Sequence, residues 1–101
     1  MIFYLLPRED WENGRLDPVA VPGEEEGFVH CCDERQVIYV RRHFFPAGQD
    51  VVALAFDPTR LPAETRYEPG TGGEPERFPH VYGTLPRDLV EFQRGVVLPE
   101  L

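Results

Sequence analysis

The sequence has few basic residues for its length and no long apolar run. Ten basic residues stand against eighteen acidic ones, which gives the 101-residue chain a formal charge of −8. A negative surface repels phosphate backbones and anionic lipid, so broad nucleic-acid binding and membrane binding are not expected. No stretch approaches the ~20 apolar residues that a membrane span requires. Residues 1–6 also lack the basic start and the length of a signal peptide, so we expect a cytoplasmic protein.

Cysteine is scarce as well, because Cys31 and Cys32 are the only two. Their adjacency strains a mutual disulfide and fits neither a zinc knuckle nor a redox CxxC pair. On a strand the two side chains would point to opposite faces, as small apolar residues in a reducing compartment can. The alternative is a reactive thiol beside His30, whose imidazolium would favour a thiolate.

The sequence also lacks the motifs of several enzyme classes. Residues 70–73 are rich in glycine, but they lack the preceding strand and the following Lys-Ser/Thr of a P-loop. No GxSxG nucleophile elbow and no carboxylate pair of the glycosidase type stands out. A metal site built from His30, His80 and Glu68 is an open alternative, although no HxH or HExxH spacing supports it. We therefore expect no metal.

The chain does contain many chain breakers and enough apolar residues for one core. Eleven prolines and nine glycines predict short elements and many turns, while 42% hydrophobic residues suit one globular domain over residues 1–101. β-Branched and aromatic runs predict strands. The expected strands are residues 2–6, 27–31, 51–56, 65–68 and 80–82, with one or two closing strands between residues 90 and 98.

One main helix is predicted over residues 33–44. Asp33 and Gln36 form a capping-box pattern, and the apolar residues that follow them have helical spacing. We also expect a short helix from residue 7 to 11, a single helical turn near residue 86, and loops at 15–26 and 69–75. This order of elements predicts an α+β fold with a compact, mostly antiparallel β-sheet, one main helix and short helical turns.

Two separate segments combine polar side chains with turn residues. The first is 27–32, where His30 shares a strand face with Phe28, and the second runs from 66–68 through the 69–75 loop to 78–83. Residues two apart on a strand share a face, so His80 lies beside Tyr82 and Arg66 beside Glu68. We predict that the segments meet across one cleft with the 69–75 loop as a lid. Core histidines and a surface Arg66–Glu68 ion pair are the alternatives.

These segments together resemble a known family. Residues 2–4, 27–32 with Gln36-Val37, 51–57, 66–68 and 78–83 are similar, in order, to the small bacterial family called domain of unknown function 952. The resemblance implies a fold like that of ADP-ribosyltransferases, with a compact split β-sheet around an NAD-binding cleft. It also implies that His30 holds the nicotinamide ribose, that Tyr67 or Tyr82 stacks on nicotinamide, and that Glu68 stabilises an oxocarbenium-like ribosyl centre.

We therefore predict an intracellular protein whose His/Tyr/Glu cleft binds a nucleotide-like or small phosphorylated ligand of the NAD or ADP-ribose type. NAD is expected as a substrate, for transfer or hydrolysis at its ribosyl bond, and no resident cofactor is predicted. The alternative is a non-catalytic module for a small ligand or for a protein partner, which the acidic surface suits. The candidate catalytic residues are His30, Glu68 and His80, and the candidate ligand-binding residues are Arg66, Tyr67, Tyr82 and Arg42.

Overall fold

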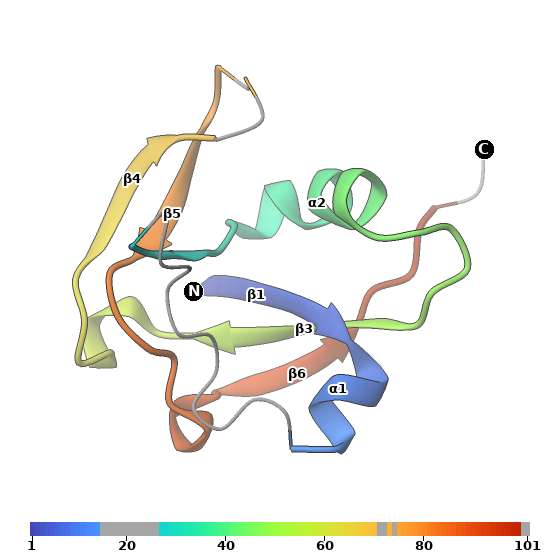
Figure 1. Ribbon diagram of the computed structural model, residues 1–101, viewed down its shortest axis with the longest axis horizontal. Helices are drawn as coiled ribbons and strands as arrows, with labels where there is room; N and C mark the ends of the chain where they lie inside the picture. The colour runs from blue at the N-terminus through green and yellow to red at the C-terminus, as the bar shows by residue number, and fades with distance from the viewer. Residues whose placement is uncertain (15–26, 71–72, 74, 100–101) are drawn as a thin grey trace.

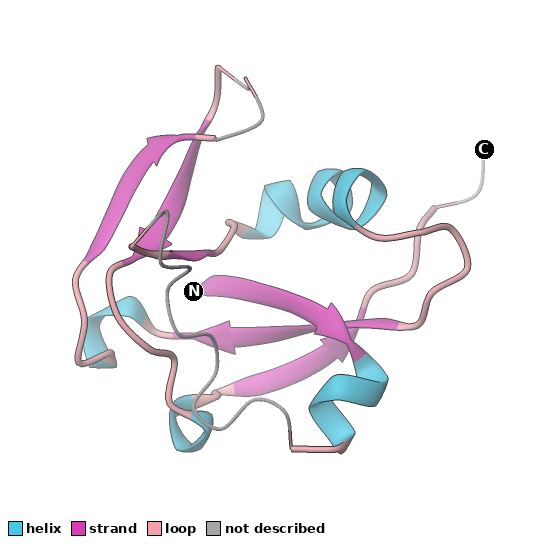
Figure 2. Ribbon diagram, in the orientation of Figure 1, coloured by secondary structure: helices cyan, strands magenta, loops and turns pink. Residues whose placement is uncertain are grey.

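Two three-stranded antiparallel sheets form the frame of the molecule (Figure 1; Figure 2). The computed structural model describes residues 1–14, 27–70, 73 and 75–99. The first sheet has the order β1 (Ile2–Pro7), β3 (Val51–Phe56), β6 (Phe92–Gly95), and the second the order β2 (Val29–His30), β5 (Arg77–Val81), β4 (Thr65–Pro69). The predicted α+β class with antiparallel strands is confirmed. The predicted 15–26 loop and part of the 69–75 loop lie outside the described residues.

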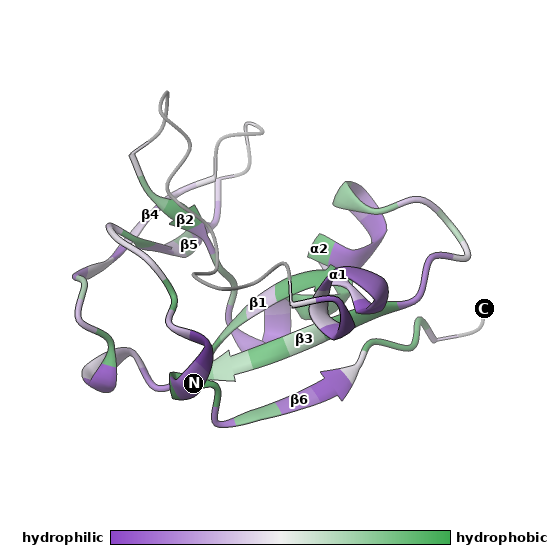
Figure 3. Cartoon of the chain, turned by 60° about the horizontal axis from the view of Figure 1, so that its bottom comes forward, coloured by the Kyte–Doolittle hydropathy of each residue, from purple (hydrophilic) through white to green (hydrophobic). Residues whose placement is uncertain are grey.

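Strand β3 lies at the centre of the first sheet and is buried along its whole length. It pairs with β1 on one side and β6 on the other. Val52, Leu54 and Phe56 enter one hydrophobic core, while Ala53 and Ala55 enter the other on the opposite face. Figure 3 shows β1 and β3 mainly in green, the colour of apolar residues. A continuous apolar run is what a strand covered on both faces requires, so the prediction of a central strand is confirmed.

The predicted main helix is a short 3₁₀ turn that continues into an α-helix. The turn η1 spans Glu34–Gln36, and α2 spans Val37–Phe44 beside β1 (Figure 1). Both halves of the predicted capping box are present, since Gln36 Oε1 accepts from the Asp33 backbone N–H at 2.8 Å. Gln36 is also buried, and its Nε2 donates to the Arg77 carbonyl at 2.8 Å. The residue that starts the helix therefore also holds it against β5.

The remaining helical segments are short. The predicted helix after β1 is α1 (Arg8–Glu12), which ends at Asn13, and Gly14 follows with φ +69°. The other two are 3₁₀ turns, η2 (Pro58–Arg60) and η3 (Arg87–Leu89). No helix in the described part of the chain has the length and apolar character needed to cross a membrane.

The structure corrects three strand boundaries. Strand β2 is limited to Val29–His30, β5 begins at Arg77 and runs through Pro79, and β6 ends at Gly95. The predicted closing strand between residues 90 and 98 is therefore β6, and residues 96–98 lie outside it. Strand β2 is short because the next two residues hydrogen-bond to different sheets: Cys31 N–H donates to the Pro79 carbonyl, while Cys32 N–H donates to the Phe3 carbonyl.

The two sheets are joined at one bridge between Phe3 and Cys32. Phe3 N–H donates to the Cys32 carbonyl at 2.8 Å, and Cys32 N–H returns a bond of 2.9 Å to the Phe3 carbonyl. Cys31 lies in one hydrophobic core and Cys32 in the other, so the prediction that they point to opposite faces is confirmed. Beyond this bridge the sheets part, and the split is the structural origin of the site described next.

Candidate functional site

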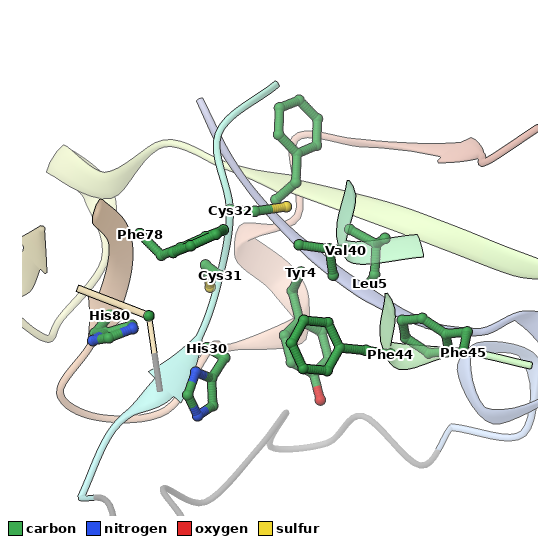
Figure 4. A pocket seen from close by; sticks show the side chains of 12 residues that line it. Tyr4, Leu5, His30, Cys31, Cys32, Val40, Phe44, Phe45, Phe78 and His80 are labelled. Carbon is green, nitrogen blue, oxygen red and sulfur yellow. The ribbon is translucent and has the colours of Figure 1, made fainter. Parts of the chain in front are cut away.

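A cleft of about 360 Å³ opens where the two sheets separate (Figure 4). If the antiparallel register at Phe3–Cys32 continued, Tyr4 would pair with Cys31 and Leu5 with His30. No such pairing occurs among the described residues, and those four side chains line the cleft instead. The lining is mostly apolar and consists of Phe3, Tyr4, Leu5, His30, Cys31, Cys32, Val40, Phe44, Phe45, Gly70, Phe78 and His80.

His80 is the buried polar residue of this lining, with 1% of its surface exposed. Its Nδ1 lies 2.9 Å from Glu68 Oε1, and the Tyr82 hydroxyl donates to the same oxygen at 2.6 Å. The hydrogen bond from Tyr82, and next that from His80, holds the Glu68 pKa below its usual range. A carboxylate can only accept, so His80 Nδ1 carries the proton and, in the neutral ring, Nε2 is the acceptor.

The second ring nitrogen of His80 lacks a hydrogen-bond partner in the described part of the chain. Nε2 is buried, and Phe28 stacks on the imidazole with a centroid distance of 3.9 Å and an interplanar angle of 19°. The His30 ring lies edge-on to His80 at 5.2 Å. A buried polar atom without a partner costs about 1–3 kcal/mol. A ligand that donates a hydrogen bond to Nε2 would remove that cost.

Arg66 and Tyr67 contact other partners than the sequence suggested. The Arg66 guanidinium lies 4.5 Å from the Tyr82 ring centroid and donates to both carboxylate oxygens of Glu64, at 3.0 and 3.1 Å. The Tyr67 hydroxyl donates to Asp33 at 2.8 Å, and burial, more than this bond, raises the Tyr67 pKa to about 12. Arg66 therefore lies beside Tyr82, but its charge is paired with Glu64. The Tyr67 side chain instead contacts Asp33.

The structure brings together four of the seven predicted site residues directly: His30, Glu68, His80 and Tyr82. Arg66 lies over Tyr82, and Tyr67 is directed elsewhere. Arg42 is exposed on α2 and is absent from the cleft lining. Its neighbour Arg41 is buried and donates to the carbonyls of Phe45 and Gln49, so it holds the end of the helix.

Sequence reasoning missed the apolar wall of the cleft. Figure 4 shows Tyr4, Phe44 and Phe45 on the side of the cleft away from His80. Burial raises the Tyr4 pKa, so its hydroxyl remains a neutral donor. Phe44 is 58% exposed although it ends an amphipathic helix. The adjacent aromatic residues Phe44 and Phe45, next to Pro46 at the end of the helix, were the available sequence signal.

The two thiols are poorly suited to nucleophilic chemistry. Cys31 and Cys32 are both free and buried. Burial, more than the neighbouring acidic groups, raises both pKa values, that of Cys32 to about 12. The thiolate is the reactive form, so the alternative of a thiol enzyme loses its physical basis. Within the described residues, no three His, Cys, Asp or Glu side chains are placed to hold a metal ion.

We expect both thiols to resist alkylation in the native protein. A pKa near 12 leaves about a thousandfold less thiolate at pH 8 than an unperturbed cysteine has. The measurement is thiol titration with a chromogenic disulfide reagent, first in buffer and then in concentrated urea. Two thiols should appear only after unfolding. A rapid reaction of one thiol in buffer would contradict the burial and restore the thiol alternative.

Replacing Tyr82 with phenylalanine is expected to raise the Glu68 pKa, because it removes the main hydrogen bond that lowers it. A lowered pKa stabilises the fold above the unfolded value of about 4.3, and this contribution is lost as the pH falls through the folded pKa. The variant should therefore lose less stability than the wild type between neutral and acid pH. Carboxyl ¹³C titration by NMR measures the pKa directly.

Tyr67→Phe is the matched control for this titration, since it removes a hydroxyl that bonds to Asp33 and not to Glu68. It should leave the Glu68 titration unchanged. If Tyr82→Phe also left it unchanged, the hydrogen bond between Tyr82 and Glu68 would be refuted.

Comparison with known proteins gives a family and a fold. A family model described as "Protein of unknown function (DUF952)" matches residues 5–92, and no curated protein matches the chain. The crystal structure of protein CC0527 from Caulobacter crescentus is 24% identical, with a TM-score of 0.75 over 97% of this chain and 87% of that one. Its solution NMR structure is 26% identical, with a TM-score of 0.68 over 92% and 81%. These names state no ligand or reaction, and the likeness to ADP-ribosyltransferases stays a prediction.

Proposed function

Because the chain belongs to the DUF952 family, which is described only as proteins of unknown function, we infer its activity from the site itself. We propose that the cleft binds a small nucleotide-like ligand that donates a hydrogen bond to His80 Nε2. The observation that carries this proposal is that His80, a residue of a largely apolar cleft, has a buried Nε2 without a hydrogen-bond partner in the described part of the chain. Small-molecule sites commonly combine apolar walls with a few fixed polar groups.

The shape and chemistry of the lining favour a planar ring with a hydroxyl-bearing sugar. The aromatic wall of Tyr4, Phe44 and Phe45 offers faces and edges on which a heterocycle can pack. On the opposite side, His80 Nε2 can accept from a ribose hydroxyl, and His30 lies next to it. A volume of about 360 Å³ holds part of a dinucleotide, such as the nicotinamide riboside end of NAD, but not a whole dinucleotide.

The same arrangement can perform a ribosyl transfer or hydrolysis. For this reaction a water molecule or acceptor hydroxyl takes the place of the ribose hydroxyl at Nε2, and it can pass its proton to that nitrogen as its oxygen bonds to the anomeric carbon. The bond from that carbon to the nicotinamide nitrogen breaks, its electron pair stays with the nitrogen, and neutral nicotinamide leaves. Glu68 is absent from the cleft lining, so in this proposal it positions His80 and fixes its tautomer and does not face the sugar.

Titration calorimetry with NAD, ADP-ribose and nicotinamide riboside tests the proposal, together with chromatography for released nicotinamide. Binding with micromolar to millimolar dissociation constants is expected. Glu68→Ala should weaken binding by about tenfold or more, since His80 loses the acceptor that orients it. Glu64→Ala removes a carboxylate that pairs with Arg66 and should have little effect.

The outcomes separate the two functions that the sequence left open. Nicotinamide release identifies a catalyst, and binding without release identifies a non-catalytic ligand module. Absence of heat with all three compounds at millimolar concentration would overturn the proposal and favour a module for protein partners.

A further inference from the structure

The described lining of the cleft contains no arginine or lysine. The chain contains no lysine at all, so a permanently charged side chain can come only from arginine. None of the twelve lining residues in the described part of the chain is an arginine. Arg15 lies outside the described residues. A ligand phosphate inside this cleft would therefore lack the bidentate guanidinium partner by which proteins usually hold phosphate.

Two arginines of the described chain that lie close to the cleft residues are already engaged. Arg66, which lies over Tyr82, donates two hydrogen bonds to Glu64. Arg41, on the helix that supplies Val40 to the lining, is buried and donates to two backbone carbonyls. Recruiting either one would break these contacts. Neither arginine can therefore bind a phosphate in the cleft without losing its present hydrogen bonds.

Apart from the imidazole of His30, the described lining groups that can bond a ligand are neutral or acceptors. His80 Nε2 accepts, and the Tyr4 hydroxyl is available as a neutral donor. A phosphate surrounded mainly by apolar side chains would lose its hydration without an ion pair in return, which is strongly unfavourable. The chain's formal charge of −8 adds a general repulsion of anions.

We infer that the cleft recognises the nucleoside part of its ligand, the ring and sugar, and leaves any phosphate outside in solvent. This inference rests on the proposed function and narrows it to a ligand class. Nucleosides, or the nucleoside end of a dinucleotide, fit the cleft, whereas ligands recognised by their phosphate do not. The sequence-based expectation is a nucleotide-like or small phosphorylated ligand, with Arg42 and Arg66 among its binding residues. A ligand held through its ring and sugar replaces it.

The test compares nucleosides with their monophosphates by titration calorimetry on the full chain. Nicotinamide riboside is paired with nicotinamide mononucleotide, and adenosine with AMP, at roughly 50 mM and roughly 500 mM NaCl. In the pair that binds, we expect the nucleoside and its monophosphate to have dissociation constants within about threefold of each other. Each dissociation constant should change by less than about twofold between the two salt concentrations. A monophosphate that binds more than about tenfold tighter, with an affinity that salt reduces, would overturn the inference. Absence of binding by all four compounds overturns the proposed function and this inference with it.

A charge-insertion variant tests the same point from the protein side. Phe44 lines the cleft and is 58% exposed, so Phe44→Arg places a guanidinium at its rim. Phe44 belongs to the aromatic wall, so its loss should weaken the nucleoside and the monophosphate alike, and the added charge should raise the ratio of monophosphate to nucleoside affinity about fivefold or more at low salt. Val97→Arg adds the same charge at a site that is 84% exposed and outside the lining, and should affect neither ligand. An equal gain in both variants, or none in Phe44→Arg, would contradict a phosphate position just outside the cleft.

Discussion

Replacing His80 with phenylalanine is expected to weaken ligand binding by about 5- to 150-fold while the protein stays folded. Phenylalanine keeps a planar ring against Phe28, which stacks on the imidazole at 3.9 Å. It removes Nε2, so a ligand donor would be buried without an acceptor, at a cost of about 1–3 kcal/mol. The lost bond to Glu68 and the removed unpartnered nitrogen act on stability in opposite directions, so the free energy of unfolding should change by about 1 kcal/mol or less.

Calorimetry with the best ligand of the wild type, together with a urea unfolding curve, measures both effects of His80→Phe. His43→Phe is the matched control, because His43 is exposed on α2 and does not line the cleft. It should retain wild-type affinity. Wild-type affinity in a folded His80→Phe protein would remove His80 from the binding site.

The largest expected effect on stability is that of Phe56→Ala. Phe56 has 0% of its surface exposed and ends the central strand β3 in one of the two hydrophobic cores. Truncating a buried phenylalanine to alanine typically costs about 3–5 kcal/mol. Domains of this size have unfolding free energies of about 5–15 kcal/mol. The variant should therefore be marginally stable or partly unfolded at ambient temperature.

Urea unfolding followed by Trp11 fluorescence measures this loss as a lower midpoint with an unchanged slope. Phe44→Ala removes the same atoms from a side chain that is 58% exposed, and its cost should stay within about 1 kcal/mol. Similar costs at the two positions would contradict the placement of β3 at the centre of the core.

Much of the fold could be predicted from the sequence because its main elements have strong local signals. The run at 51–56 has no polar face, which requires a strand covered on both sides. The capping residues Asp33 and Gln36 located the start of the main helix, and alternation placed Cys31 and Cys32 on opposite faces. Each of these signals is contained in a few adjacent residues.

The boundaries that were wrong depend on contacts between distant segments. The strand at 80–82 was expected to begin only after Pro79, since proline cannot donate to a β-ladder. The Pro79 carbonyl instead accepts from Cys31, and β5 continues through this residue. The length of β2 is set by the crossing of the chain from one sheet to the other at Cys32, which no local pattern encodes.

The candidate site was predictable in composition but not in its pairings. Strand alternation correctly placed His80 and Tyr82 on one face, yet it could not tell that both would bond to Glu68 while Arg66 would pair with Glu64. It also could not show the apolar wall, because that wall forms only when the end of α2 faces the gap between the sheets. The hydrogen-bond partner of a polar side chain depends on which distant segments of the chain pack next to it.

The most direct test of the account is the ¹⁵N spectrum of the His80 imidazole, recorded without and with nicotinamide riboside. We expect a proton on Nδ1, since that nitrogen lies 2.9 Å from the Glu68 carboxylate, which can only accept. On ligand binding the Nε2 resonance should shift as it accepts a hydrogen bond, while the His43 ring stays unchanged. An Nε2–H tautomer, or a ligand that binds without moving the His80 Nε2 resonance, would contradict the proposal that this nitrogen is the ligand's acceptor.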